Sequence, residues 1–362
     1  MKIVEQVKTT VSRSAGEWFL GSGIQEAKGG VARYYFSDER QRNAPLSTEI
    51  TGYAASALVN LYKQSSEVQY LDAAINAANY LVDAWDETCS AMPFERDEPN
   101  PRHSFFFDDG IIVRGLLAVW REYKNEDFLA TAVKVGTSMA TDFAKGNDLV
   151  PILELPSKAQ EERNPQRWSR SSACYQLKAA LGWYELWETT DDERYLTNYR
   201  RLLHSSLANH DTFLPGVESE CLVMDRLHPY CYFLEGLLPV IDDPDAAKAT
   251  IWGIERVAGL VESISPKFLR SDVIAQLLRV RIFADQFGVA PLNEQTGQKE
   301  AQLLQGFQSN DSDDALQGGF WFGRKSREFL PFMNPVSTAF ANQALEMWAQ
   351  RGARTFDWHW LI

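Results

Sequence analysis

The sequence predicts an all-α fold made of repeated helical hairpins that close into a ring. The first observation is a repeat, in which an aromatic residue is followed eight positions later by an aromatic–Leu pair that opens an amphipathic stretch. The second is a short polar connector inside each repeat, such as residues 188–193. Self-similarity of this kind indicates a repeated supersecondary unit, here two antiparallel helices joined by a short loop. The three instances are Tyr62 with Tyr70-Leu71, Trp120 with Phe128-Leu129, and Trp187 with Tyr195-Leu196.

The two helices of each hairpin are predicted to differ in burial. Between residues 50 and 62 apolar side chains cover nearly the whole surface, so this first helix is expected to be an inner, buried one. In the second helix Leu71, Ala78 and Trp85 share one face while Asp72 points elsewhere, which is typical of a half-exposed outer helix. The same contrast predicts inner and outer pairs at residues 111–120 and 128–143, 173–187 and 195–207, 229–240 and 246–264, and 272–287 and 296–307.

Two predicted helices remain without a partner in their own hairpin. One spans residues 4–20, before the first inner helix, and the other is an inner-type helix at 336–348. If these two pair, six hairpins close into a ring. Since neither a Pro/Gly/Ser-rich linker nor an abrupt shift in composition interrupts the chain, we expect residues 1–362 to form a single domain.

Long connections are predicted before several inner helices. The inner helices are expected to start near residues 49, 109, 171, 228, 271 and 335, which are steps longer than those of a solenoid repeat. The surplus lies mostly in residues 87–107, 146–169 and 211–227, and long loops in a compact domain are usually functional. These loops should emerge on one rim, where the inner helices begin. Short β-hairpins are expected there after Gly29-Gly30 and Gly318-Gly319, where aromatic residues alternate.

Over nearly the whole chain this pattern resembles the six-hairpin, (α/α)6-toroid glycosidase-like superfamily. The resemblance is one of repeat architecture. It implies carbohydrate chemistry, since that group includes unsaturated glucuronyl hydrolases, polysaccharide lyases, and N-acyl-glucosamine and cellobiose epimerases. Fold likeness alone does not establish a reaction, so the candidate residues have to be judged by their own chemistry.

The composition excludes two classes of partner. Lys and Arg total 36 against 49 Asp and Glu, a formal net charge of −13, and a surface this acidic repels nucleic acids and anionic membranes. No apolar run approaches the roughly twenty residues that span a bilayer. Residues 1–14 contain no continuous apolar core, so no secretory signal is expected.

The cysteines point to a reducing compartment. No two of them have the C-x-x-C spacing that is typical of metal or redox sites. We therefore expect buried free thiols rather than disulfides or metal ligands, and a cytoplasmic location. The four residues are Cys89, Cys174, Cys221 and Cys231.

Carboxylates at the predicted starts of inner helices are the leading catalytic candidates. Asp108 and Asp109 follow three phenylalanines, and a carboxyl held near aromatic walls has a raised pKa and can stay protonated as a general acid must. A helix N-cap would account for one aspartate but not both. Glu49 stands at the first inner helix as a second acid or base, or as a residue favoured by the helix dipole. The resemblance likewise implies that Asp108 or Asp109 is catalytic, because aspartates near inner-helix starts do this work in toroidal glucuronyl hydrolases.

His228 is the histidine expected at an inner-helix start, beside a proline at a first-turn position. Histidine moves protons near neutral pH, which an epimerase or lyase needs at a sugar carbon. A structural hydrogen bond is the alternative interpretation.

A further group of polar and aromatic residues near the rim is predicted to contact a sugar. Aromatic rings stack on pyranose faces, and arginines bind carboxylates, so a Trp beside arginines suits an acidic sugar. A solvated loop or a rim plug is the alternative for each segment. The candidates are Tyr53, Arg114, Trp168, Arg170, Glu218, Tyr230, Trp321, Arg324 and Asn334.

The sequence thus favours a glycoside hydrolase that acts on an oligosaccharide, including one that contains uronic acid, through Asp108, Asp109 and Glu49. Sugar epimerisation or isomerisation, or a lyase reaction, with His228 as the base remains open. A non-catalytic toroid that binds a glycan or a protein through its rim also remains open. No metal-ligand spacing, phosphate loop or nucleophile elbow stands out, so no metal or cofactor is expected.

Overall fold

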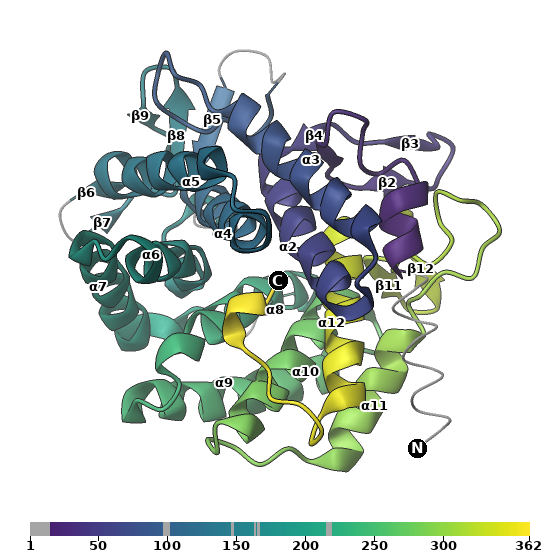
Figure 1. The fold of residues 1–362 in the computed structure, drawn as a ribbon. Helices are drawn as coiled ribbons and strands as arrows, with labels where there is room; N and C mark the ends of the chain where they lie inside the picture. The colour runs from purple at the N-terminus through teal and green to yellow at the C-terminus, as the bar shows by residue number, and fades with distance from the viewer. Residues whose placement is uncertain (1–14, 97–101, 146–147, 163, 165–166, 215–218) are drawn as a thin grey trace. The chain divides into compact units, whose positions relative to one another are not determined.

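The computed structural model describes residues 15–96, 102–145, 148–162, 164, 167–214 and 219–362. These residues are mainly helical, with short antiparallel strands between the helices (Figure 1). They divide into two compact units. Unit 1 comprises Met1–Ile24, Tyr34–Ala44 and Asp211–Ile362, and unit 2 comprises Gln25–Arg33 and Pro45–His210. The single domain expected for residues 1–362 stays a prediction.

Unit 2 contains three helical hairpins. In each, a buried inner helix packs against the half-exposed outer helix that follows it, and the inner helices α2 and α4, and α4 and α6, also pack side by side. The outer helix α5 ends in a π-helical turn, Met139–Phe143. The helices are α2 (Thr48–Ser65) and α3 (Val68–Ala84), α4 (Phe106–Tyr123) and α5 (Glu126–Ser138), and α6 (Leu177–Thr190) and α7 (Glu193–Asn209).

The inner helices of unit 2 approach each other backbone to backbone. A Cβ atom at Gly110 would overlap the backbone of Ala179 in α6, and one at Gly115 would overlap the backbone of Gly52 in α2. Only glycine permits such a close approach at these positions. The small residues therefore bring α2, α4 and α6 close together, and the first turns of α2 and α4 carry the candidate carboxylates.

Short strands lie at the starts of inner helices in unit 2, as the sequence predicts. β1 pairs with β4 just before α2, and β5 pairs with β8 just before α4. A 3-10 turn, Cys174–Gln176, leads into α6. The strands are β1 (Val31–Ala32), β4 (Leu46–Ser47), β5 (Arg102–Phe105), β6 (Ala144–Lys145), β7 (Asp148–Leu149), β8 (Ile152–Leu155) and β9 (Ala159–Gln160).

Unit 1 contains two further hairpins and the last inner helix. The inner helices α8 and α10, and α10 and α12, pack against each other. Residues 15–21 are helical, but the start of the predicted first helix lies outside the described residues, and its pairing with the last inner helix stays a prediction. The helices are α8 (Glu220–Gly236) and α9 (Pro244–Ile264), α10 (Ser271–Gln286) and α11 (Glu294–Gln305), and α12 (Pro335–Gln350).

Two small sheets precede α10 and α12 in unit 1. β11 and β12 form the hairpin predicted after Gly318-Gly319, and β10 extends it to three strands. In the other sheet β13 pairs with β2, which pairs with β3. The strands are β2 (Tyr35–Phe36), β3 (Arg42–Asn43), β10 (Phe268–Arg270), β11 (Gly323–Lys325), β12 (Glu328–Phe329) and β13 (Phe332–Met333).

The start of α8 differs from the prediction. Proline was interpreted as a first-turn residue, but Pro229 lies inside α8, which begins at Glu220. The Ser219 hydroxyl caps the helix by accepting a hydrogen bond from the Leu222 amide at 3.4 Å, so the helix is already established upstream. Pro229 then only removes one hydrogen bond of the helix. His228 is therefore a mid-helix residue, and the loop expected at 211–227 is partly helical.

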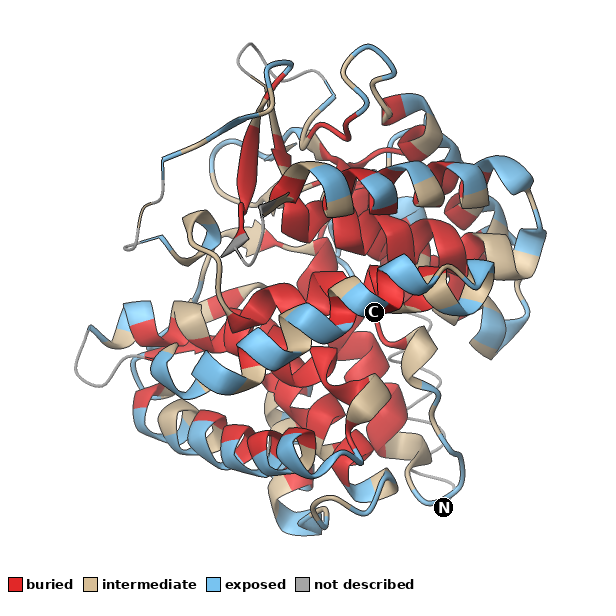
Figure 2. Ribbon diagram, turned by 90° about the vertical axis from the view of Figure 1, so that its left-hand side faces the viewer, coloured by how far each residue is buried: buried red, intermediate tan, exposed pale blue. Residues whose placement is uncertain are grey.

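The buried ion pairs of the core involve inner helices in both units. In unit 2 the Glu185 carboxylate forms ion pairs with Arg114 and Arg121, with a nitrogen–oxygen distance of 2.6 Å in each. In unit 1 Glu235 pairs with Arg279 at 2.5 Å, and both side chains are fully buried. Figure 2 shows the buried residues running along such packed helices and the exposed residues along the outward faces of their partners.

Two further predictions from the sequence concern membrane-spanning helices and the cysteine thiols. None of the described helices combines the length and the hydropathy that crossing a bilayer requires. All four cysteines are free, as predicted, and Cys174 and Cys231 are buried. Cys89 is only partly buried and Cys221 is exposed, which corrects the expectation that every thiol is buried.

Candidate functional site

Unit 2 places two carboxylates in the first turns of adjacent inner helices. The hydroxyl of Ser47 caps α2 by accepting from the amide of Ile50, which holds Glu49 in the first turn. Asp108 lies in the first turn of α4. Asp108 is buried, with 7% of its surface exposed, whereas Glu49 is half-buried. Because α2 and α4 pack together, the two carboxyl groups lie within electrostatic reach of each other.

Burial and mutual repulsion keep this pair of acids protonated at unusually high pH. Burial raises the pKa of Glu49 to about 7, and the nearby Arg33 guanidinium only partly opposes that rise. Burial raises the pKa of Asp108 well above its usual range, and the charge of Glu49 adds to the effect. Two interacting carboxyls of this kind titrate in two steps that belong to the pair. Between the steps the pair holds one proton, which makes an acid and a base available together.

Asp109 belongs to a different environment from its neighbour. It is completely buried, and neither of its carboxyl oxygens has a hydrogen-bond partner among the described residues. Burial and the charge of Asp142 raise its pKa well above the usual range, although Lys158 opposes them. Asp142 itself accepts from Lys158 at 2.7 Å and from the Ser138 hydroxyl at 2.8 Å. Asp109 is therefore influenced by Asp142 and Lys158 and not by Glu49, although its own charge also raises the pKa of Asp108.

Aromatic residues stand beside Asp108. The phenol of Tyr175 is fully buried, and Asp108 is among the causes that raise its pKa, after burial and Cys174. Its ring meets that of Trp168 edge to face at 5.2 Å, and Trp168 is half-exposed. Arg170, on the same 3-10 turn as Trp168, lies 3.4 Å from the Glu161 carboxylate. The predicted Trp168 and Arg170 thus lie on the Asp108 side of unit 2, with the arginine already paired.

Arg33 is a part of this site that the sequence analysis did not select. Its Nε lies 3.0 Å from the Glu95 carboxylate, and its guanidinium faces the ring of Phe94. It also lowers the pKa of Glu49. A basic residue directly after β1, whose partner strand β4 leads into α2, is the signal that would have identified it.

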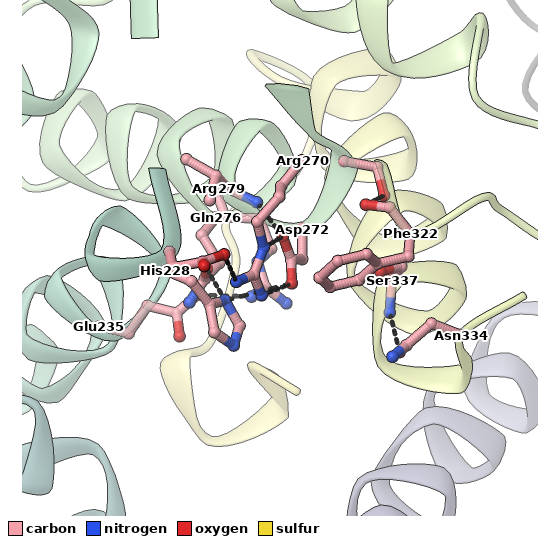
Figure 3. Close-up of polar contacts among 12 residues, drawn as sticks. His228, Glu235, Arg270, Asp272, Gln276, Arg279, Phe322, Asn334 and Ser337 are labelled. Carbon is pink, nitrogen blue, oxygen red and sulfur yellow. Dashed lines mark hydrogen bonds and ion pairs between the residues drawn. The ribbon is translucent and has the colours of Figure 1, made fainter. Parts of the chain in front are cut away.

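Unit 1 holds a second candidate centre, built around His228 (Figure 3). Its Nδ1 lies 2.8 Å from Oε1 of Gln276 and 3.4 Å from Oδ2 of Asp272. The ring of Tyr232, one turn further along α8, lies 4.4 Å away. The imidazole is buried, and burial lowers its pKa to about 4, against the opposing charge of Asp272. His228 is therefore neutral at pH 7.

The partners of Nδ1 determine the tautomer of His228. Both the Gln276 amide oxygen and the Asp272 carboxylate are acceptors, so Nδ1 carries the hydrogen. Nε2 then has the free lone pair. A neutral imidazole whose Nδ1–H is held by acceptors is the arrangement that a general base requires.

Asp272 is kept ionised by an arginine on the preceding strand. Arg270 holds it with two hydrogen bonds, from Nε at 3.0 Å and from Nη2 at 2.6 Å, and also contacts Asp225 at 3.2 Å. Burial alone would raise the pKa of Asp272, but the Arg270 charge outweighs it and brings the pKa below the usual value. Phe322 covers the guanidinium at 4.5 Å, as Figure 3 shows.

Several predicted sugar contacts have structural roles. Arg114 is buried in an ion pair with Glu185 in the middle of α4, and its contact with a sugar stays a prediction. Tyr230 is fully buried against Phe213, Phe233 and Trp252, so it packs the interface of α8 and α9. The side chain of Asn334 caps α12 by accepting from the Ser337 amide at 3.1 Å. These three positions satisfy the packing and capping needs of the helices.

The other predicted contacts are distributed over both units. Tyr53 is buried within α2. Trp321 and Arg324 lie on or beside the β11–β12 hairpin and are half-exposed. Glu218 lies outside the described residues.

Asp272, Gln276 and Arg270 were missed by the sequence analysis. The signal for Asp272 was present, because it stands in the first turn of a predicted inner helix just as Asp108 does. Gln276 carries no such signal, since its importance comes from a contact with His228, 48 positions away. Arg270 stands only two positions before Asp272, so a basic residue beside that first-turn aspartate is the signal that would have identified it. Within the described ranges no group of three or more His, Cys, Asp or Glu side chains is arranged to hold a metal ion.

The fold matches solved toroidal enzymes over nearly the whole chain. No family profile and no curated protein matches the sequence. A sugar epimerase from a ruminal bacterium is 9% identical, with a TM-score of 0.70 over 98% of this chain and 100% of that one. An unsaturated glucuronyl hydrolase from Bacillus sp. GL1 is 12% identical, with a TM-score of 0.64 over 93% and 96%. An inactive variant of an α-1,6-mannanase from Salegentibacter sp. HEL1_6 is 10% identical, with a TM-score of 0.60 over 94% and 99%.

These matches confirm the predicted fold class. The chain has the (α/α)6-toroid fold of six-hairpin glycosidase-like proteins, with small antiparallel sheets between its helices. At identities this low the likeness concerns the fold, and solved proteins with it include both epimerases and hydrolases.

Proposed function

We propose that this protein is a carbohydrate-active enzyme that hydrolyses a glycosidic bond through Asp108 and Glu49. The observation that carries the proposal is the pairing of two buried or half-buried carboxyls, on adjacent inner helices, whose pKa values are both raised. Glycoside hydrolysis requires a proton donor to the leaving oxygen and a second carboxylate that activates water or attacks the sugar. A coupled acid pair near neutral pH supplies both groups.

The two residues are suited to different roles. Asp108 is the more deeply buried, and burial raises its pKa well above the usual range, so we assign it the role of the general acid. Glu49 is half-exposed and has a pKa of about 7, so it is the member that loses its proton first and acts on water or the sugar. In the reaction Asp108 protonates the glycosidic oxygen while the bond to the anomeric carbon breaks. Glu49 removes a proton from the attacking water as the water oxygen bonds to the anomeric carbon, and transfer of that proton from Glu49 through solvent to Asp108 restores both groups.

A solved protein of the same fold also has an adjacent pair of aspartates, as the start of α4 does, and this likeness supports the choice of Asp108. The inactive α-1,6-mannanase variant has two adjacent aspartates replaced by asparagine, and this chain also has an adjacent pair, Asp108 and Asp109. The structure here separates the surroundings of the two residues, so single substitutions should distinguish them. Only Asp108 faces Glu49 electrostatically.

The test is a turnover screen of neutral, acidic and amino oligosaccharides with products identified by mass. Hydrolysis adds the mass of one water across the products. Asp108→Asn should lower kcat/KM at least a hundredfold, because an amide cannot donate the proton. Asp109→Asn is the matched control and should change it less than threefold, since Asp109 is fully buried and Glu49 is not among the groups that shift its pKa. Equal losses in the two variants would contradict the assignment.

Sugar epimerisation or isomerisation is the second candidate, and His228 favours it. A neutral histidine with Nδ1–H held by Gln276 and Asp272 is suited to remove a proton from a sugar carbon. In that case the product mass equals the substrate mass, and a solvent deuteron enters the product at the reacting carbon. His228→Asn should then abolish deuterium incorporation while Asp108→Asn retains it. A product with a new double bond would indicate a lyase, and binding without turnover would indicate a glycan-binding toroid.

A further inference from the structure

The β11–β12 hairpin of unit 1 presents an aromatic surface. The rings of Trp321 and Phe329 are nearly parallel, at 14° with centroids 5.6 Å apart. Phe329 is 42% exposed and Trp321 is half-exposed. The fully buried ring of Phe307 meets Phe329 edge to face at 5.7 Å and supports it from below. We call Trp321, Phe329 and Arg324 the hairpin ledge.

The hairpin ledge is held rigidly. The amide of Trp321 donates to the carbonyl of Phe307 at 3.0 Å, and the hydroxyl of Ser271 donates to the carbonyl of Trp321 at 2.7 Å. Ser271 is the first residue of α10, and the next residue of that helix, Asp272, belongs to the His228 network. Phe322, beside Trp321, turns the other way and covers Arg270. The hairpin ledge and the His228 network are therefore fixed to the same helix start.

Arg324 distinguishes the hairpin ledge from an ordinary apolar patch. It lies directly opposite Phe329 in the β11–β12 register, so both side chains are on one face of the hairpin. Its Nε is buried without a hydrogen-bond partner, and among the described residues no carboxylate pairs with its guanidinium. Its one contact of note is with the ring of Phe307, at 5.5 Å.

The other arginines of the candidate centres are neutralised. Arg33 pairs with Glu95, Arg170 with Glu161 and Arg270 with Asp272. An arginine that is half-buried without such a partner still has to satisfy its donors, and a planar guanidinium does so best with a carboxylate or a sulfate. Beside it, two aromatic faces offer a surface for an apolar ring face.

We propose that the hairpin ledge is a binding site for an anionic sugar unit of an oligosaccharide. The reacting carboxylates Asp108 and Glu49 are not part of this binding site. The sugar ring lies against Phe329, the more exposed ring of the stacked pair that it forms with Trp321, and its carboxylate or sulfate group is bound by Arg324. That the ligand is a sugar rests on the proposed function. The anionic group and its position rest on the geometry of the hairpin alone.

The test is calorimetric binding of three tetrasaccharide probes by the full chain at low salt: a neutral cello-oligosaccharide, a hyaluronan oligosaccharide with carboxylates, and a carrageenan oligosaccharide with sulfates. At least one anionic probe should bind tenfold or more tightly than the neutral one, because of the charge-assisted contact. The two anionic probes distinguish carboxylate from sulfate recognition. Equal affinity for all three probes, or binding of none, would overturn the proposal.

Matched variants locate the binding. Arg324→Gln should remove the tenfold preference, whereas Arg327→Gln, which deletes the same charge from the exposed turn of the same hairpin, should keep it. Phe329→Ala should weaken binding of the preferred probe three- to tenfold, whereas Phe287→Ala, with the same 42% exposure on α10's end, should not. If Arg324→Gln and Arg327→Gln behave alike, the charge effect is general and the site is refuted.

The two proposals fail separately. Binding of the anionic probe is measured without turnover and should persist in Asp108→Asn. Loss of the hydrolytic activity in that variant tests the carboxylate pair, whereas loss of the anionic preference in Arg324→Gln tests the hairpin ledge. Full hydrolysis by Asp108→Asn would overturn the proposed reaction and leave the binding result standing.

Discussion

Each unit of this protein buries an aspartate in the first turn of an inner helix, and the two aspartates behave in opposite ways. Asp108 in unit 2 has a raised pKa, because burial is reinforced by the negative charge of Glu49. Asp272 in unit 1 has a lowered pKa, because Arg270 holds it with two hydrogen bonds despite equal burial. Both have the same favourable helix-end dipole. The nearest charged partner therefore decides the ionisation, and the helix position does not.

The buried glutamates of the two units differ in how many arginines form ion pairs with them. Glu185 in unit 2 is shared by two arginines, and burial is outweighed by them, so its pKa is lowered. Glu235 in unit 1 is paired with Arg279, which also donates to Gln343 at 2.9 Å and faces the ring of Phe340. Redundancy of partners in unit 2 should make its ion pair the more tolerant of substitution.

The largest expected effect is on stability, from breaking these ion pairs. Arg279→Met should destabilise unit 1 by about 3–5 kcal/mol, because it leaves the fully buried Glu235 without its arginine. Arg121→Met should cost unit 2 less, about 1–2 kcal/mol, since Arg114 still pairs with Glu185. Urea unfolding of both variants, followed separately for each transition, measures the difference. Equal losses of unfolding free energy in the two variants would show that Arg114 does not compensate for the loss of Arg121.

The next effect is a loss of stability in acid that comes from His228. Its pKa is about 4 in the folded protein and about 6.5 when unfolded, so unfolding takes up a proton between these values. Stability should therefore fall as pH drops from about 6.5 to 4, by up to about 3 kcal/mol from this group. His228→Asn should flatten that part of the stability curve relative to the unsubstituted protein. Parallel curves over this range would contradict the buried neutral imidazole.

Glu49 should produce the opposite and slightly smaller dependence. Its folded pKa of about 7 lies above the unfolded value, so folding binds a proton between about 4.5 and 7. The stability that this proton supplies is present below about pH 4.5 and is lost as pH rises through 7, by about 1–3 kcal/mol after allowance for partial exposure. Glu49→Gln should remove this loss. If the variant shows the same decline between pH 4.5 and 7, another group is responsible.

The smallest expected effect is a shift in the titration of His228 when Arg270 is neutralised. The Arg270 charge lowers the pKa of His228, and Asp272 raises it. In Arg270→Gln the Asp272 carboxylate faces the imidazole without its arginine, so the pKa of His228 should rise by about one pH unit. Proton NMR titration of the histidine ring measures it. An unchanged value would mean that the Arg270 substitution is compensated by protonation of Asp272.

The candidate site was predictable where it depends on local sequence. The position of Asp108, Asp109 and Glu49 in or near first turns follows from helix periodicity and capping residues. Which of the two aspartates interacts with Glu49 was not predictable. Consecutive helix residues point about 100° apart, and only the packing of α2 against α4 selects which aspartate meets Glu49.

The start of α8 marks a limit of local rules. The proline beside His228 predicts a helix start, yet Ser219 caps the helix ten residues before Pro229. A cap hydrogen bond and the packing of α8 against α10 outweigh one missing N–H. The role of His228 therefore depends on Gln276 and Asp272, which reach it from another helix.

By itself the sequence determined the architecture, because repeated helical periodicity, aromatic–Leu pairs and connector lengths are local properties that fold a chain into hairpins. It also determined which residue types stand near the helix starts. The tertiary structure decided their ionisation and their partners. It brings Glu49 to Asp108, Gln276 to His228, and Phe329 and Trp321 into one ledge with Arg324. Charge–charge energies depend on distance and burial, and neither quantity is a property of a residue's neighbours along the chain.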